Sequence, residues 1–360
     1  KQIRYKGWGA MTKDNYKRTR LKDIAEIADV SVATVSIILK DPDTKRFSTK
    51  TKRQIIDLAK SLNYTPNMAA RSLVQHKTFA LGLIIPDLSN PFFANLAKKI
   101  ETLARAYNYT VLMVNSDEHY ENDIKLFDSL FRRNMDGIIL AASANSYGHE
   151  KQINRMIERA NIPTITIDRS LKDFKGSQVV FDNKLGTYIA TAHCIEKGHQ
   201  NIGFISTRET SLNGYFRHEG YREAMLDHQL EYDESLVFFG GFDFKTGYDA
   251  AEVLLKQNIT AVVASNDLNA YGFKKRAEAL GYRIPHDISI VGFDNLEMND
   301  YISEGITSID LNVDAMAKST IEIMIRMIEE KDFVERLVLK PKLYERDSVI
   351  DLNQEMKNDA

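Results

Sequence analysis

Cysteine is almost absent from this sequence: Cys194 is the single example among 360 residues. One cysteine excludes an internal disulfide and a metal site built from several thiolates, and it suits a reducing compartment. The neighbouring residues predict a buried helical position for Cys194 rather than a reactive thiol.

Long apolar segments are missing as well. No run approaches the roughly 18 residues of a transmembrane helix, and the basic, polar N-terminal residues lack the apolar segment of a signal peptide. We therefore expect a cytoplasmic protein without membrane contact. A hydrophobic content of 43% and a charged content of 27% are typical of globular chains and exclude collagen-like or largely disordered sequences.

The motifs of common enzymes are also missing. The chain has no P-loop, GxGxxG, GxSxG or HExxH pattern. Asp117, Glu118 and His119 are adjacent, but three consecutive side chains do not all point at one ion without a special loop, so we expect a solvated loop there. The sequence predicts no enzyme activity, no metal and no cofactor.

Charge is distributed unevenly along the chain, although the formal net charge is only -2. Residues 1–78 contain 17 Lys and Arg against seven Asp and Glu, and the remaining residues contain 31 against 43. This asymmetry predicts an N-terminal module that meets a polyanion such as nucleic acid. The alternative is a solvated basic tail.

The N-terminal part contains a helix-turn-helix pattern. Residues 1–18 show no periodicity and are expected to be a flexible tail. Apolar residues then recur at helical spacing in three short segments of an expected domain over 19–65, namely 21–28, 35–39 and 55–62. Ser31 and Ser48 stand where N-caps are wanted, and Asp29 occupies the turn position, which Asp can fill because it enters the left-handed region easily.

The second helix of this pattern leaves one face outward. Its residues are the candidate base readers: Val32, Ala33, Thr34, Ser36 and Ile37. Hydroxyl groups can contact base edges or phosphates, and small apolar side chains can contact a thymine methyl. After Tyr64, residues 66–78 are expected to form a short hinge helix, with Asn67 as its cap, and a linker.

From Ala80 onward, short apolar runs alternate with amphipathic helical stretches. Such alternation predicts parallel sheets flanked by helices, and two series of runs predict two lobes. The runs are 81–87, 110–116, 136–142, 163–168, 178–182, 201–206, 236–240, 260–267 and 288–294.

Polar residues follow the predicted strands, at the edge of a parallel sheet where ligands bind. They are Asp87, Asp168, Asp182, Asn266, Asp267, Asp294 and Asn295. Carboxylates and amides suit a polyhydroxyl ligand, and the aromatic faces of Phe92, Phe93 and Phe242 can cover a sugar ring. For Asp182 and Asp267 a structural role, and for Phe92 and Phe93 a place in the core, are the alternatives.

Five signatures occur in a characteristic order. They are VSxxTVS at 30–36, PNxxARSL at 66–73, IPDLSNPFF at 85–93, GHQNIGFI at 198–205 and ISIVGFDN at 288–295. Over residues 20–349 the chain resembles the LacI/GalR family of bacterial repressors. The resemblance implies an all-α helix-turn-helix domain with a hinge helix, followed by a two-lobed α/β domain like that of periplasmic binding proteins.

The implied ligand-binding domain spans 79–349. Its first lobe is expected over about 79–180 plus 295–330, its second over about 181–294 plus 331–349, and residues 350–360 are expected to form a tail.

The resemblance also implies roles for residues in the DNA-binding part. Val32, Ala33 and Ile37 match specificity positions, and Ser48 and Thr51 match phosphate contacts; Ser31 starts the same recognition helix. In the hinge, Leu73 matches a leucine that wedges into the minor groove, and Arg71 is expected to add phosphate or minor-groove contact. The family usually carries Arg at the position of Ile37, so the operator is expected to differ at that base pair.

For the ligand site, the resemblance implies that Arg217 binds the effector. Asn266 and Asp294 match hydroxyl-binding positions, and Phe242 matches a stacking aromatic. Phe92 and Phe93 match a pair that lines the first-lobe side of the site, and Asp168 and Arg169 are assigned to the site as well.

We therefore expect a homodimeric repressor of carbohydrate-metabolism genes that binds pseudo-palindromic double-stranded operator DNA under the control of a small sugar-like effector. A nucleobase effector, or a sugar-binding receptor without DNA function, is the alternative.

Overall fold

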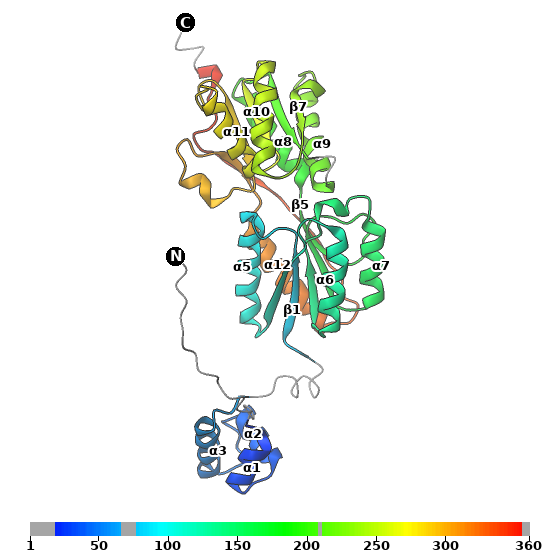
Figure 1. Cartoon of the computed structure of the whole chain (residues 1–360), viewed down its shortest axis with the longest axis vertical. Helices are drawn as coiled ribbons and strands as arrows, with labels where there is room; N and C mark the ends of the chain where they lie inside the picture. Colours follow the sequence, from blue (N-terminus) through cyan, green and yellow to red (C-terminus); the bar gives the residue numbers. More distant parts are fainter. Residues whose placement is uncertain (1–18, 66–76, 208–210, 355–360) are drawn as a thin grey trace, which may run out of the picture. The chain divides into compact units, whose positions relative to one another are not determined.

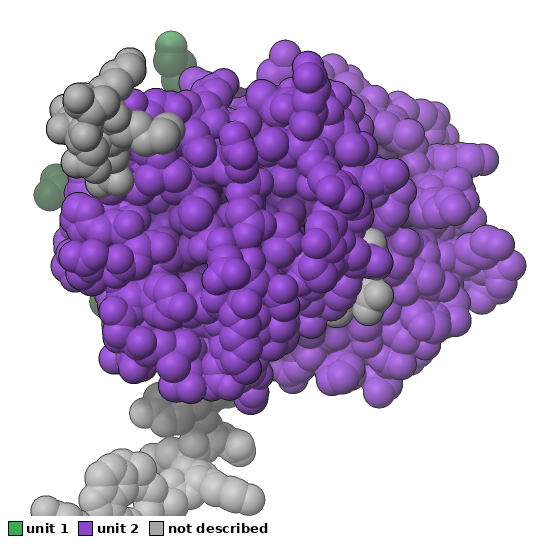
Figure 2. Space-filling model, turned by 90° about the horizontal axis from the view of Figure 1, so that it is seen from above, with its two compact units in different colours: residues 1–78 green, residues 79–360 purple. Residues whose placement is uncertain are grey.

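The computed structural model describes residues 19–65, 77–207 and 211–354. The chain divides into two compact units, residues 1–78 and 79–360, which Figure 2 distinguishes by colour. None of the helices within these described ranges is long and apolar enough to cross a membrane.

The first unit contains three helices. They are α1 (Leu21–Ala28), α2 (Val32–Lys40) and α3 (Thr49–Ser61). Asp29 ends α1 in the left-handed conformation, with φ of 50°, and this turns the chain directly into α2. Ser31 and Ser48 cap α2 and α3 as the sequence predicted, each accepting a hydrogen bond from a backbone N–H of the first turn.

The three helices share one small core. Ile24 of α1, Val35 and Ile38 of α2, and Ile55 of α3 are fully buried. Tyr64 and Leu62, which follow α3, pack against this cluster. The spacing of these apolar residues is therefore what brings the helices together, and it leaves the opposite face of α2 outward.

The first lobe of the second unit is a six-stranded parallel sheet covered by helices (Figure 1). Its strands in spatial order are β11 (Arg336–Leu339), β5 (Ser177–Phe181), β4 (Thr164–Asp168), β3 (Gly137–Leu140), β1 (Ala80–Ile85) and β2 (Thr110–Asn115). Its helices are α5 (Pro91–Ala106), α6 (Tyr120–Arg132), α7 (Glu150–Ala160) and α12 (Val313–Glu329).

The second lobe repeats this architecture. Its strands in spatial order are β12 (Lys342–Tyr344), β10 (Thr307–Asp310), β9 (Ser289–Phe293), β8 (Ala261–Ala264), β6 (Ile202–Ser206) and β7 (Val237–Phe239). All pairs are parallel except β10 with β12. The helices are α8 (Asn183–Glu196), α9 (Leu212–Asp227), α10 (Phe244–Leu254) and α11 (Asp267–Ala279), and short 3₁₀ turns precede or follow several elements: η1 (Ala144–Ser146), η2 (Glu234–Leu236), η3 (Leu255–Gln257) and η4 (Glu297–Asp300).

The expected lobe boundaries were wrong near the C-terminus. Strand β10 lies in the second sheet, although residues 295–330 were assigned to the first lobe, and β11 lies in the first sheet, although 331–349 were assigned to the second. Neither strand belongs to the series of apolar runs that identified the earlier strands, so its lobe is set only by pairing with β9 or β5. The chain consequently passes between the lobes after β5, β10 and β11.

The expected C-terminal tail also begins too early. The Ile350 N–H donates to Ser289 Oγ at 3.0 Å, and Asn353 Nδ2 donates to the Glu196 carbonyl at 2.9 Å. Residues 350–354 are therefore packed on the second lobe.

Cys194 is buried on α8, as predicted. Burial raises the pKa of its thiol to about 12. Because the thiolate is the reactive species, this thiol is inert in the folded protein.

Candidate functional sites

The outward face of α2 carries the candidate base readers. Val32, with 44% of its surface exposed, lies beside exposed Ala33 and Ser36, whereas Thr34 and Ile37 are half-buried. Val35 and Ile38 of the same helix are buried in the core. The helix therefore presents small apolar and hydroxyl groups, which can contact a base edge or a thymine methyl.

The starts of α2 and α3 have the same local structure. Ser31 Oγ lies 2.9 Å from Thr34 Oγ1, and Ser48 Oγ lies 2.8 Å from Thr51 Oγ1. In each pair the serine also accepts the threonine N–H at 3.1 Å. Both helix N-termini are exposed, and an exposed N-terminus with hydroxyl groups suits a DNA phosphate. The expected contacts of Asn67, Arg71 and Leu73 lie outside the described residues.

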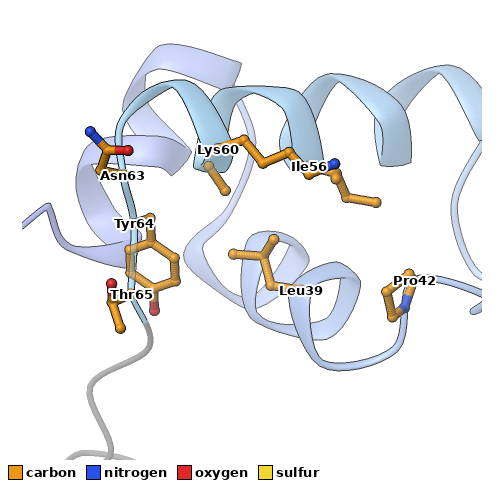
Figure 3. A pocket seen from close by; sticks show the side chains of 8 residues that line it. Leu39, Pro42, Ile56, Lys60, Asn63, Tyr64 and Thr65 are labelled. Carbon is orange, nitrogen blue, oxygen red and sulfur yellow. The ribbon is translucent and has the colours of Figure 1, made fainter.

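A hollow of about 540 Å³ lies between α2 and α3 (Figure 3). Its lining is mostly apolar and ends at Thr65: Leu39, Pro42, Ile56, Ala59, Lys60, Asn63, Tyr64 and Thr65. The lining contains no carboxylate, so the hollow differs in chemistry from the polar site of the second unit.

In the second unit, buried charged side chains converge from both lobes. Arg169 follows β4 of the first lobe, and its guanidinium lies over Phe93 of α5, with Cζ 5.2 Å from the ring centroid. The same Cζ lies 5.8 Å from the ring of Phe242, which belongs to the second lobe. Arg169 also forms a bidentate ion pair with Glu118, which follows β2.

Arg217 on α9 is the corresponding cation of the second lobe. Its Nε donates to Asn183 Oδ1 at 2.8 Å, and its Nη1 donates to the Ser265 carbonyl. Its Nη2 lies 3.9 Å from Asp294 Oδ1. The guanidinium also stacks on Phe293, with Cζ 3.8 Å from the ring centroid, so that its orientation is determined from several sides.

Phe242 connects the two cations. Its ring centroid is 5.5 Å from Arg217 Cζ and 5.8 Å from Arg169 Cζ. An aromatic ring within 6 Å of two guanidinium groups can cover the C–H surface of a small ligand while the cations donate hydrogen bonds to its oxygens.

Burial shifts the ionisation of these groups. Desolvation raises the pKa of Asp294 well above its ordinary value, and Arg217 offsets part of this rise. Burial likewise raises the pKa of Asp168 and lowers that of Arg217. For Arg169, burial lowers the pKa, but Glu118 and Asp168 outweigh this and the net shift is upward. The site thus combines two cations with carboxylates whose charge depends on their surroundings.

The backbone is strained at two of these carboxylates. Asp168 has φ of 61° and Asp294 has φ of 104°, and Asn295 beside it has φ of 51°. Non-glycine residues rarely adopt such angles, and they cluster at functional sites. Both strained aspartates lie at the carboxyl ends of strands, which is where the sequence predicted a ligand.

The structure distinguishes the predicted site residues by what their polar groups contact. Phe93 faces Arg169, but Phe92 packs on Phe93 and Phe181 in the core, with centroid distances of 5.1 and 6.4 Å. Asn266 caps α11 and donates to the Phe242 carbonyl at 2.9 Å, so it positions the aromatic residue.

The acidic residues at the other strand ends have structural partners. Asp267 accepts hydrogen bonds from Leu296 N–H, Asn299 and Ser308, and Asp182 caps α8. Asp87 accepts from Ser89 within its own turn.

Three residues of this site escaped the sequence analysis: Glu118, Asn183 and Asn213. The solvated-loop interpretation of residues 117–119 was wrong for Glu118, because a loop with two left-handed residues, Asp117 and Glu118, turns its carboxylate onto Arg169. Asn213 could have been found, since it precedes Arg217 by one helical turn and therefore shares its face of α9. Nowhere in the described ranges is there a cluster of His, Cys, Asp or Glu that could hold a metal ion.

Comparison with known proteins gives matches along almost the whole chain. Residues 20–67 match the model described as bacterial regulatory proteins, lacI family, and residues 78–347 match periplasmic binding proteins and sugar binding domain of LacI family. The ribose operon repressor of Halalkalibacterium halodurans is 32% identical over 315 residues, which are 87% of this chain and 91% of that protein.

Two solved structures show the same fold. A LacI family regulator from Enterococcus faecium with bound ribose is 29% identical, with a TM-score of 0.69, and the match covers 76% of this chain and 99% of that one. The lac repressor dimer bound to operator and the anti-inducer ONPF has a TM-score of 0.83 at 21% identity, over 93% and 100% of the two chains, and supports the fold alone.

Proposed function

This chain belongs to the lacI family of bacterial regulatory proteins and is therefore a DNA-binding regulator of transcription. We propose that a sugar-like ligand bound between its two lobes controls its affinity for an operator. The observation that carries the proposal is the arrangement around Phe242. Two guanidinium groups, from Arg169 and Arg217, lie within 6 Å of this one aromatic ring, and buried carboxylates adjoin both.

This chemistry suits a compact molecule with several hydroxyl groups. Each hydroxyl both donates and accepts, so it can accept from a guanidinium N–H and donate to a neighbouring carboxylate such as Asp168 or Asp294. Phe93 and Phe242 provide apolar faces for the C–H side of the ring. We take a pentose such as ribose as the first candidate, because a repressor and a regulator with ribose in their names are similar to this chain.

A nucleobase is the second candidate ligand. Phe242 and Phe93 could hold a planar ring, and the amide and carboxylate groups could contact its edge. The two candidates differ in what they require of the carboxylates. A base presents few donors, whereas a sugar presents one at each hydroxyl, and the buried acceptors Asp168 and Asp294 favour the sugar.

On the DNA side, we propose that α2 lies in the major groove, with Val32, Ala33, Ser36 and Ile37 towards the bases and the starts of α2 and α3 towards phosphates. Leu73 is proposed as the hinge wedge, with Asn67 and Arg71 beside it. Isoleucine cannot donate a hydrogen bond to guanine, so the operator should differ from the family's common sequence where Ile37 reads it.

We further propose that the protein is a homodimeric repressor without catalytic activity that acts on chromosomal DNA in the cytoplasm. Two copies would place two heads on half-sites of a pseudo-palindromic operator. A ligand that prefers one arrangement of the lobes would change the relation between the two heads and hence the affinity for DNA.

The test begins with the ligand. Thermal unfolding of the full chain is measured with D-ribose, other aldoses, adenine, guanine and hypoxanthine; a ligand that binds only the folded state raises the melting temperature. We expect an aldose to do so. A response to nucleobases alone would favour the second candidate.

The regulatory step is tested with the ligand found in this way. Binding to genomic fragments is followed by gel shift at fixed salt concentration, with and without the ligand. The proposal requires that the ligand change the affinity for a specific fragment. Equal retardation of all fragments, or equal affinity in both conditions, would count against ligand-controlled operator binding.

A further inference from the structure

Glu118 forms the most extensive carboxylate contact of the ligand site. Its Oε2 accepts from Arg169 Nη1 and its Oε1 accepts from Arg169 Nη2, both at 2.7 Å. Oε2 also accepts the Ala144 N–H at 2.6 Å. The carboxylate thus connects three separate loops of the first lobe, those after β2, β3 and β4.

The ion pair with Glu118 determines which N–H groups of Arg169 remain available to a ligand. A guanidinium has five N–H groups, in fixed geometry. Two point at Glu118, and a third, on Nη1, points at the Ala142 carbonyl at 2.9 Å. Within the described part of the chain the guanidinium of Arg169 forms no further hydrogen bond, so its Nε–H and second Nη2–H remain as a pair of parallel donors.

Asp168 lies beside this free pair. Its Oδ2 is 3.9 Å from Arg169 Nε, too far for a hydrogen bond but close enough for a ligand hydroxyl to contact both groups. A hydroxyl placed there accepts from Nε–H and donates to the Asp168 carboxylate. Two neighbouring hydroxyl groups of a ligand could each accept from one of the two parallel donors, Nε–H and Nη2–H, which we call the fork.

The charge of Arg169 is already balanced before a ligand arrives. Its side chain is 8% exposed, and the facing carboxylate of Glu118 is 35% exposed. An anionic group placed at the fork would lie near the Glu118 carboxylate in a poorly solvated site, where like charges repel strongly.

We propose that Glu118 is a positioning and specificity residue of the ligand site. It orients Arg169 so that the Nε–H and one Nη2–H face the ligand, and its negative charge makes the site bind an uncharged polyhydroxyl compound more tightly than a phosphate ester. The inference rests on the proposed function, because it assumes that a polyhydroxyl ligand occupies the site between the lobes.

The experiment uses the full chain and three proteins: wild type, Glu118→Gln and Asp117→Asn. The Asp117→Asn variant removes one negative charge from the adjacent residue, whose carboxylate contacts Asn115 rather than Arg169. Each protein is titrated with inorganic phosphate, D-ribose 5-phosphate and D-ribose at constant ionic strength, and the melting temperature is recorded.

Inorganic phosphate should not produce a saturable rise for wild type or Asp117→Asn. Glu118→Gln should bind phosphate at least about tenfold more tightly than wild type, because the anion can then take the charged hydrogen bonds that Glu118 occupied. Adding Arg169→Gln to Glu118→Gln should remove that response. A folded Glu118→Gln protein that gains no phosphate binding overturns the inference.

The titration of wild type tests the proposed selectivity even if the Glu118→Gln variant does not fold. Saturable binding of inorganic phosphate or D-ribose 5-phosphate to wild type, as tight as that of D-ribose, contradicts the proposed selectivity, and its absence supports it. The proposed function fails in a different way, namely if no uncharged sugar or nucleobase stabilises wild type while the phosphate results are as expected.

Discussion

Asn213 of the second lobe donates a hydrogen bond through Nδ2 to the main-chain carbonyl of Asp168 in the first lobe, over 3.3 Å. Asn213 is 3% exposed, and within the described residues its Oδ1 has no hydrogen-bond partner. Buried polar atoms are almost always partnered, so an open acceptor here suits a ligand donor. The contact joins the lobes at Asp168, a residue of the proposed ligand site with a φ of 61°.

Replacing this asparagine should weaken the contact between the two lobes. We expect Asn213→Ala to weaken ligand binding about 3- to 10-fold, because a neutral hydrogen bond contributes about 0.5 to 1.5 kcal/mol. Isothermal titration with the ligand from the thermal screen measures this. Asn201→Ala is the matched control, since Asn201 Nδ2 donates to carbonyls of Gln257 and Asn258 inside one lobe. Equal losses in both variants would argue against a cross-lobe role.

Arg217 should be essential for the response to ligand and dispensable for DNA binding. Arg217→Gln removes donors that contribute about 1.5 to 3 kcal/mol each when charged, so ligand affinity should fall at least about tenfold. Operator affinity without ligand, measured by fluorescence anisotropy, should stay unchanged. Arg222→Gln on the same helix is the control, because its side chain is 51% exposed and contacts Glu219 at 3.9 Å and the ring of Tyr232 rather than the groups around Phe242. A normal ligand response in Arg217→Gln would refute the site.

The operator preference should depend on residue 37. Ile37→Arg should create a preference for guanine of about 1 to 3 kcal/mol at one position of each half-site, because Arg donates two hydrogen bonds to guanine. Selection from a randomised operator library measures the preference. Ile27→Arg adds the same charge on α1, where Ile27 is 59% exposed, and should raise affinity without changing sequence preference. Identical selected sequences for Ile37→Arg and wild type would contradict the assignment of α2 as the reading helix.

Asp267 should make stability depend on pH in an unusual direction. Burial raises the pKa of Asp267 to about 6, although three hydrogen bonds oppose the rise. Between pH 4 and 6 the folded state therefore retains a proton that the unfolded state releases, and the contribution of this group to stability decreases as pH rises through 6. At about 1.4 kcal/mol per pKa unit, the change amounts to about 2 to 3 kcal/mol.

Asp267→Asn isolates this contribution. The amide does not titrate, so the stability of wild type relative to the variant should decrease from pH 4 to pH 7, as followed by thermal unfolding with circular dichroism. A constant difference across this range would show that Asp267 is ionised in the folded protein throughout. Asp123, a buried carboxylate of the first lobe, titrates in both proteins and cancels in the difference.

Much of the fold could be predicted from the sequence, because helical spacing and apolar runs report which face of an element is buried. The three helices of the head and strands β1 to β9 follow from this signal. Strands β10 to β12 do not, because they stand outside the series of apolar runs and the place of each depends on pairing with a strand from an earlier part of the chain. The C-terminal lobe boundaries were wrong for this reason.

The proposed ligand site likewise contains residues that could be predicted from the sequence and residues that could not. Arg217, Phe242 and Asp294 could be proposed as site residues because they stand in motifs that resemble a known family. Glu118 could not, because its role depends on a left-handed loop and on Arg169, which is 51 residues away in the chain. Of the two roles considered for Asp267, the structural one is supported by its partners Leu296, Asn299 and Ser308, none of which is near it in sequence.

The burial of Cys194 has a practical consequence for measuring how the lobes move. Since the chain has no other cysteine, and this thiol is inert while the protein is folded, any cysteine introduced at the surface becomes the one site that a maleimide dye can reach. Pairs of dyes, one on exposed Phe131 replaced by cysteine in the first lobe and one on exposed Val253 replaced by cysteine in the second, would report the separation of the lobes by energy transfer without first removing a native thiol.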